Sequence, residues 1–165
     1  NIGDSFIGLK VMQKKYIMGN KLKKYFINKY YCPDIPYNFS KYLFSFANTS
    51  IDISDGLISD MLRLINSQKL SFSIDVDKIP ISKKLNDYLK KYNKPKNKLV
   101  FNGDDYQILF TSSKRNRLRI RTIANKLNQK VTIIGKINDG YKKNLLKEDN
   151  KSLKLSNFKG YSHKF

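Results

Sequence analysis

The sequence predicts a single α+β domain with a mixed β-sheet. Segments whose apolar residues recur at helical spacing alternate along the chain with segments of strand character. The clearest strand is residues 70–76, where apolar and polar side chains alternate. With 165 residues and 19.3 kDa, the chain is long enough to bury the core of one ordinary domain. We therefore expect one domain over residues 1–165.

Apolar and aromatic side chains at helical spacing predict three helices before the first strand, over residues 4–16, 21–31 and 39–46. Asp4 or Ser5 can cap the first of these helices, and Gly19 ends it. Gly8 weakens the same helix unless another segment packs closely against it.

Residues 50–57, which read Ser-Ile-Asp-Ile-Ser-Asp-Gly-Leu, organise the rest of the chain. A short apolar run leads into the turn, and an amphipathic helix over residues 57–67 follows at once. This order indicates a strand, a tight turn and a helix N-terminus. Ser54 and Asp55 can cap free N–H groups there, and Gly56 lets the backbone turn sharply.

Asp52 and Asp55 are separated by two residues of this turn, so their carboxylates can face one pocket. Two carboxylates, the Ser54 hydroxyl and the dipole of a helix N-terminus together suit a polyphosphate bound to Mg²⁺. The local pattern alone fits an ordinary capped helix after a strand better, and this alternative stays open.

The second half of the chain predicts a strand over residues 70–76, a helix capped by Ser82, a strand over 106–111, a helix over 114–127, a strand over 131–137 and a loose hairpin over 142–156. The dipeptide Asn102-Gly103 predicts a tight turn, which delivers the adjacent acids Asp104 and Asp105 just before a strand. Acids at the end of a core strand suit a cationic substrate or a metal ion.

The formal net charge is +20 at pH 7, with 33 Lys and Arg against 13 Asp and Glu. Clustered positive charge is typical of nucleic-acid-binding proteins. Here the Lys residues are scattered through helices and loops, and the densest Arg run, residues 115–121, fits the exposed face of a helix at least as well. We therefore expect no specific nucleic-acid partner, and attraction of anionic nucleotides as a side effect.

Cys32 is the only cysteine, which excludes an intrachain disulfide and a zinc cluster. No apolar run is long enough to span a bilayer, and no signal-peptide pattern opens the sequence. We therefore expect a cytoplasmic, reducing setting and no membrane partner.

Four segments carry a resemblance to a known family, namely residues 2–9, 52–57, 102–110 and 160–163. They read Ile-Gly-Asp-Ser-Phe-Ile-Gly-Leu, Asp-Ile-Ser-Asp-Gly-Leu, Asn-Gly-Asp-Asp-Tyr-Gln-Ile-Leu-Phe and Gly-Tyr-Ser-His. In this order they resemble the C-terminal domain of the thiamine-monophosphate kinase family, within the PurM-like superfamily of aminoimidazole-ribonucleotide synthetase. The resemblance spans essentially the whole chain. It implies the PurM C-terminal-like fold, in which α-helices flank a mixed β-sheet.

The resemblance implies ATP-dependent phosphorylation of thiamine phosphate to thiamine diphosphate, with Mg²⁺ as cofactor. It implies that Asp52 and Asp55 bind Mg²⁺ and that Ser54 contacts the ATP phosphates. It assigns Asp104 and Tyr161 to thiamine phosphate. The family also has an N-terminal domain that supplies further metal-binding aspartates and a homodimer interface. We therefore expect these 165 residues to be inactive, or nearly so, on their own.

The sequence departs from the family pattern at several positions. Asn102 stands where the family usually has Gly, and Gln107 stands where it usually has Glu, which removes a charge. Ser162 replaces the usual Asp, and Lys164 looks inserted before the final Phe. Three alternatives therefore stay open: another ATP-dependent synthetase of the superfamily, a basic nucleic-acid-binding domain without catalysis, and a noncatalytic remnant.

Overall fold

A computed structural model of the chain describes residues 1–66, 68–140, 143–149, 151–153 and 155. Its helices are α1 (Asp4–Met12), α2 (Asn20–Tyr31), α3 (Tyr37–Ser40), α4 (Leu57–Leu64), α5 (Lys83–Lys91) and α6 (Arg117–Lys126). Its strands are β1 (Ala47–Ile53), β2 (Leu70–Asp75), β3 (Gln107–Ser112), β4 (Gly135–Asp139), β5 (Leu145–Glu148) and β6 (Lys151–Leu153). Short 3₁₀ helices lie between them, namely η1 (Leu43–Ser45), η2 (Val76–Lys78), η3 (Lys96–Phe101) and η4 (Lys114–Asn116). Tyr161 lies outside the described residues.

The described strands form two sheets. β1 and β3 make an antiparallel ribbon, and the other sheet has the order β4-β2-β5-β6. The four-stranded sheet is mixed, because β2 runs antiparallel to β4 and parallel to β5. These sheets and the surrounding helices confirm the predicted α+β class.

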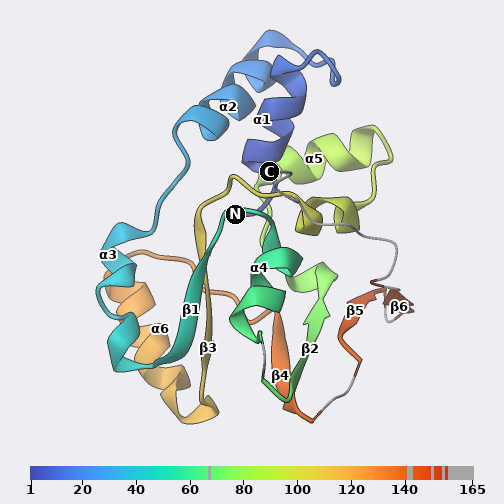
Figure 1. Ribbon diagram of the computed structural model, residues 1–165. Coiled ribbons are helices and arrows are strands. Elements are labelled where there is room, and N and C mark those ends of the chain that lie inside the picture. The colour runs from blue at the N-terminus through green and yellow to red at the C-terminus, as the bar shows by residue number, and fades with distance from the viewer. Residues whose placement is uncertain (67, 141–142, 150, 154, 156–165) are drawn as a thin grey trace, which may run out of the picture.

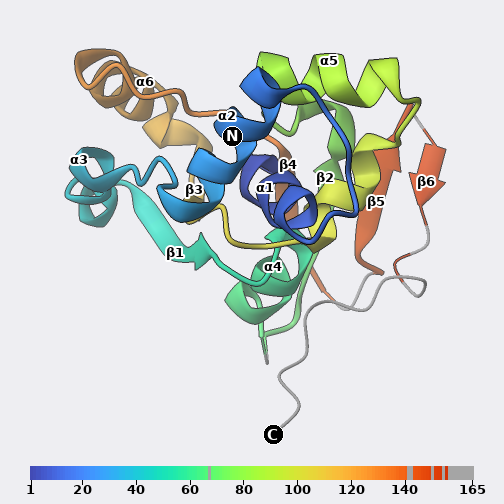
Figure 2. The same cartoon turned by 90° about the horizontal axis from the view of Figure 1, so that it is seen from above.

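The β1–β3 ribbon divides the molecule. Helices α3 and α6 lie on one side of it, and α4 lies with the four-stranded sheet on the other side (Figure 1). The view from above shows the same division, with α5 running past one end of the four-stranded sheet (Figure 2). Helices α1 and α2 pack together beyond the end of the ribbon where β1 finishes and β3 begins (Figure 1). Within the described residues, no helix is both long and apolar enough to cross a membrane.

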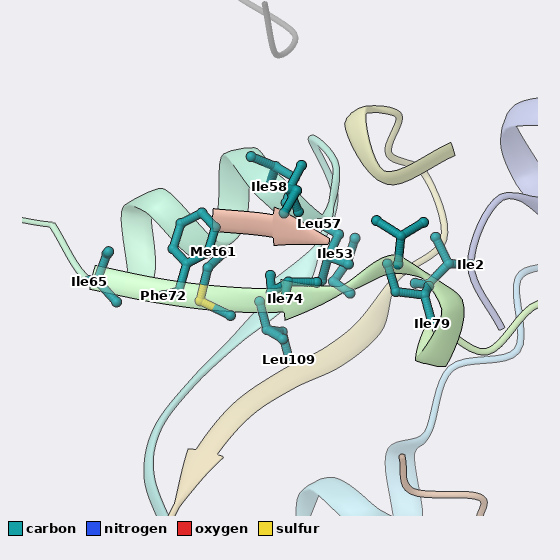
Figure 3. Close-up of a cluster of buried hydrophobic side chains, with 12 residues drawn as sticks. Ile2, Ile53, Leu57, Ile58, Met61, Ile65, Phe72, Ile74, Ile79 and Leu109 are labelled. Atoms are coloured by element: carbon teal, nitrogen blue, oxygen red, sulfur yellow. The ribbon is translucent and has the colours of Figure 1, made fainter. Parts of the chain in front are cut away.

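The largest hydrophobic cluster holds α4 against β2 and the ribbon. Leu57, Ile58 and Met61 on α4 meet Phe72 and Ile74 on β2 (Figure 3). Burying each such side chain contributes about 1.5–3 kcal/mol. This packing confirms the apolar stripe predicted for α4, and it fixes the start of the helix beside the end of β1. Two further clusters lie between α1, α2 and α5 and between α3, η1 and α6.

Gly8 is the point of closest approach between α1 and α2. A Cβ at Gly8 would overlap the carbonyl oxygen of Phe26. The close packing that was expected to explain a glycine within this helix is therefore present. The expected cap of α1 by Asp4 or Ser5 is wrong. The N-cap residue is Gly3, and it makes no side-chain cap hydrogen bond.

Several elements differ from their predicted bounds. The helix expected over residues 4–16 ends at Met12, because the backbone enters the left-handed region at Lys14 with φ of +57°, and the helix expected over residues 57–67 ends at Leu64. The strand expected over residues 131–137 begins only at Gly135, because its partner β2 ends at Asp75 and the paired register stops at Ile74 opposite Gly135. The helix expected over residues 39–46 is divided into α3 and η1. The hairpin expected near the end of the chain is confirmed by the antiparallel pair β5–β6.

Candidate functional site

Two turns from distant parts of the sequence meet at one end of the ribbon. Because β1 and β3 are antiparallel, the end of β1 lies beside the start of β3, with Ile53 opposite Gln107. The turn after β1, residues 54–56, therefore touches the turn before β3, residues 102–106; we refer to them as the site turns. The Asp104 N–H donates to the Ser54 carbonyl oxygen at 3.0 Å, and the Tyr106 N–H donates to that of Ile53 at 2.9 Å.

The second site turn has a strained backbone. Asp104 and Tyr106 are both in the left-handed region, with φ of +67° and +49°. A non-glycine residue held there costs about 1–3 kcal/mol. The two hydrogen bonds to the end of β1 hold these conformations in place. Strain of this kind is typical of functional turns. Here it belongs to the segment of backbone that carries Asp104.

Two glycines allow the site turns to touch. A Cβ at Gly103 would overlap the Ser54 carbonyl oxygen. Gly56 has φ of +120°, and a Cβ there would lie 2.8 Å from the carbonyl carbon of Phe101. The contact between the two turns therefore depends on the absence of a side chain at both positions.

Replacing Gly103 by Ala should separate the site turns. Overpacking a well-packed contact costs about 1–3 kcal/mol. We expect Gly103→Ala to lose about 3 kcal/mol of unfolding free energy, because the atom in the way is backbone and cannot rotate aside. Gly19→Ala is the matched control, since a Cβ at Gly19 meets no atom within 4 Å. Equal urea midpoints for the two variants would contradict this account of the turns.

Asp60 organises the first site turn from within α4. Its side chain is 0% exposed, and its Oδ2 accepts the N–H groups of Ser54 at 3.0 Å, Asp55 at 3.1 Å and Gly56 at 3.1 Å. The expectation that Ser54 and Asp55 cap this helix is wrong, because the N-cap residue, Gly56, has no side-chain cap and Asp60 takes up the turn's N–H groups instead. These N–H groups already have an acceptor, so an anion bound here has to use side chains or a metal ion.

The Asp55 carboxylate acts on Asp104 across the site turns. Burial raises the pKa of Asp104, and the neighbouring Asp55 carboxylate raises the pKa further. The Asp55 carboxylate forms an ion pair with Arg63, whose guanidinium also contacts Asp60 Oδ1 at 3.1 Å. Repelling carboxylates that are brought together by a rigid backbone are typical of cation sites. The structure therefore brings together Ser54, Asp55 and Asp104.

Asp52 lies slightly apart from this group. It is exposed on β1, opposite Ile108 of β3, while its neighbour Ile53 points into the core. Among the residues that the structure describes, no three His, Cys, Asp or Glu side chains gather into a metal-binding group. Mg²⁺ needs only one or two protein carboxylates when water and substrate phosphates complete its shell. The carboxylates of the site turns therefore fit this ion without forming a closed cage.

Asp105 fastens the second site turn to the start of α1. It is buried, and its carboxylate accepts the Gly3 N–H at 2.6 Å and the Ser5 N–H at 3.3 Å. Burial raises the pKa of Asp105 to about 7; the two N–H groups oppose the rise and the nearby Asp4 carboxylate adds to it. A titratable carboxyl, whose neutral form is favoured by burial, is thereby placed in the interior next to the turn that carries Asp104.

Asp4 extends this buried acidic network to α2 and α5. Its carboxylate accepts hydrogen bonds from Ser82 Oγ at 2.7 Å and from the Tyr25 hydroxyl at 3.0 Å. Burial raises the pKa of Asp4 as well, against these two donors. Ser82 also caps α5 as expected, by accepting the Leu85 N–H at 3.1 Å. Sequence reasoning missed the roles of Asp4, Asp60 and Asp105, for which the only signal was an acid at or next to a predicted turn.

The side-chain amide of Gln107 donates hydrogen bonds that a carboxylate at this position could not donate. Its Nε2 donates to the carbonyl oxygens of Asp34 at 2.7 Å and Asp105 at 3.1 Å. A Glu carboxylate has no proton to donate at neutral pH. Gln, in place of the family's usual Glu, therefore suits the two backbone carbonyl groups that face residue 107 in this chain.

Residues 49–147 match the family described as AIR synthase related protein, C-terminal domain. The thiamine-monophosphate kinase of Buchnera aphidicola subsp. Schizaphis graminum is 37% identical over 143 residues, covering 86% of this chain and 44% of that protein. The corresponding protein of Buchnera aphidicola subsp. Acyrthosiphon pisum is 33% identical over 166 residues, covering 98% of this chain and 50% of that protein. The solved structure of AaThiL complexed with AMPPCP and TMP is 28% identical with a TM-score of 0.75, covering 99% of this chain and 48% of that chain.

The matched regions include both site turns, and they support the fold described above. The chain spans about half the length of the curated relatives that it matches. The region of the family match contains β1, α4 and β3, and therefore both site turns. The likeness to AaThiL confirms the predicted PurM-like fold over nearly the whole chain. This chain therefore belongs to the AIR synthase related protein family and carries the C-terminal domain of that family.

Proposed function

We propose that this chain is the C-terminal half of a thiamine-phosphate kinase, which transfers a phosphate from ATP to thiamine phosphate and forms thiamine diphosphate. One observation carries the proposal: the two motif segments meet as the site turns, in a chain related to proteins named thiamine-monophosphate kinase. A relative of the same fold binds AMPPCP and TMP. Phosphoryl transfer requires mainly positioning and charge neutralisation, which paired turns with acidic side chains can supply.

We assign the roles of individual residues within this proposal. Asp52 and Asp55 bind Mg²⁺, and Ser54 contacts the ATP phosphates. The Ser54 contact uses the hydroxyl, because the Ser54 N–H already donates to Asp60. Asp104 and Tyr161 hold thiamine phosphate, through its cationic ring system or the metal shell of its phosphate. A cation beside Asp104 would relieve the repulsion from Asp55.

A second, N-terminal domain completes the active site of the proposed enzyme. The coverage of about half of each relative supports a two-domain protein, in which an N-terminal domain supplies further aspartates and a homodimer interface. The reaction takes place in the cytoplasm, in line with the single cysteine. No specific nucleic acid takes part.

Asp52→Asn tests the metal assignment. The protein to use is a two-domain chimera, in which the N-terminal half of the Buchnera aphidicola subsp. Schizaphis graminum relative precedes this chain. We expect Asp52→Asn to lower Mg-ATP-dependent turnover at least about 100-fold. The loss of stability should be small, because Asp52 is exposed.

Asp87→Asn, on the exposed side of α5, is the matched control for this experiment and should leave turnover unchanged. Thermal unfolding of both variants checks that the fold is kept. Full turnover by a folded Asp52→Asn chimera would show that the metal assignment is wrong.

A further inference from the structure

We propose that Arg63 is the counter-cation of Asp55 in the metal-free protein, and that a divalent cation arriving at the site turns displaces it toward Asp60. The inference rests on the proposed role of Asp55 in binding Mg²⁺. It adds a residue that governs how tightly the site takes up the ion.

The contacts of Arg63 support this assignment. Its Nη1 pairs with Asp55 Oδ2 and also with Asp60 Oδ1, the latter at 3.1 Å. The Arg63 side chain is 50% exposed, whereas those of Asp55 and Asp60 are 15% and 0% exposed. The guanidinium is therefore the more exposed partner of this ion pair, in contact with a carboxylate that is mostly buried.

A guanidinium and a divalent cation compete for the Asp55 carboxylate. Both are positive, so they repel each other at short range, and Arg63 contacts Oδ2, one of the two Asp55 oxygens that a metal ion could bind. Arg63 lies half in solvent on the last turn of α4, so it can move without disturbing the core. The metal ion therefore binds against the energy of the Arg63–Asp55 ion pair.

Asp60 provides the position to which Arg63 withdraws. It lies three residues before Arg63 on α4, so the two side chains remain neighbours on one helix face. Asp60 cannot follow the metal ion, because its other oxygen is held by the N–H groups of the first site turn. The charge of Arg63 is therefore kept beside the site while its contact with Asp55 is released.

Titration of Mg²⁺ into the ¹⁵N-labelled two-domain chimera, with AMPPCP present so that phosphate oxygens and both domains can complete the metal shell, tests this inference without any turnover. The amide signals of residues 54–56 and 103–105 report binding at the site turns. We expect Arg63→Met to bind Mg²⁺ about fivefold more tightly than the wild type, since an exposed ion pair no longer opposes binding. Arg121→Met is the charge-matched control, because Arg121 lies exposed on α6 and its loss changes the net charge equally. Adding Asp55→Asn to Arg63→Met should remove the gain.

Each result decides the inference. Tighter binding by Arg63→Met, but not by Arg121→Met, supports it, and Arg63→Gln should repeat the gain if the Met variant folds poorly. Equal Mg²⁺ affinity in all these proteins overturns the role of Arg63 and leaves the proposed function standing. No shift of the site-turn signals in any of them overturns the role of Arg63 together with the proposed metal role of Asp55.

Discussion

Raising the pH from 5 to 8 is expected to lower the unfolding free energy of this chain by about 3 kcal/mol more than that of its Asp105→Asn variant. The reason is the buried Asp105 carboxyl, whose pKa is about 7 in the folded chain against 3.8 in its ordinary state. The amide introduced by Asp105→Asn would resemble the protonated acid, because it keeps an acceptor for the Gly3 N–H and carries no charge.

The direction follows from the raised pKa. Below pH 3.8 the carboxyl is protonated in both the folded and the unfolded chain, and its contribution to stability is complete. Between pH 3.8 and about 7 the unfolded chain loses the proton while the folded chain keeps it, so stability falls as the pH rises. Asp60, whose pKa burial also raises, acts in the same direction in both proteins. Asp4 lies close to Asp105, so part of the difference between the two pH profiles arises from the coupled titration of these two carboxyls.

Urea unfolding at several pH values measures this difference. Asp87→Asn is the control, because Asp87 is exposed on α5 and should show the same pH profile as the wild type. Parallel profiles for Asp105→Asn and the wild type would mean that folding does not raise the pKa of Asp105.

Asp60→Ala is expected to lower the unfolding free energy of the chain by a similarly large amount. Removing the carboxylate leaves the N–H groups of Ser54, Asp55 and Gly56 without their acceptor. An unsatisfied buried donor costs about 1–3 kcal/mol. The Gly56 N–H is buried and the other two N–H groups are partly buried, so we expect a total loss of about 3 kcal/mol. This corresponds to a fall in Tm of about 6–12 °C for a chain of this size.

Asp60→Asn separates the hydrogen bonds from the charge. The amide oxygen still accepts N–H groups, while the ion pair with the half-exposed Arg63 is lost at about 1 kcal/mol or less. Thermal unfolding of the two variants should therefore show at least twice the loss for Ala. Equal losses would indicate that the charge of Asp60, rather than its acceptor oxygen, holds the first site turn.

The sequence predicted those features that depend on neighbouring residues. The alternation in residues 70–76 became β2, the apolar stripe after Gly56 became α4, and Ser82 caps α5 as expected. Each follows from local periodicity or from a cap within one turn of the helix. The strand expected from residue 131 was longer than the observed β4, because strand length is set by a partner far away in the sequence.

The sequence singled out the two site turns but not the residues that hold them in place. The segments containing Ser54 and Asp104 were both expected to carry function, and the structure places them side by side. The parts played by Asp60 and Asp105 depend on burial and on hydrogen bonds that reach across the fold, the longest from Gly3 to Asp105. Sequence patterning carries no signal for such contacts, because any acid near a turn looks alike until the chain has folded.

The decisive measurement for the kinase assignment is formation of thiamine diphosphate from thiamine phosphate and Mg-ATP by the two-domain chimera. We expect conversion that depends on Mg²⁺ and ATP, with little or none by the 165-residue chain alone. A folded chimera that binds ATP but leaves thiamine phosphate unchanged would contradict the claim and point to another substrate within the superfamily. Equal turnover by the isolated chain would contradict its assignment as half of the enzyme.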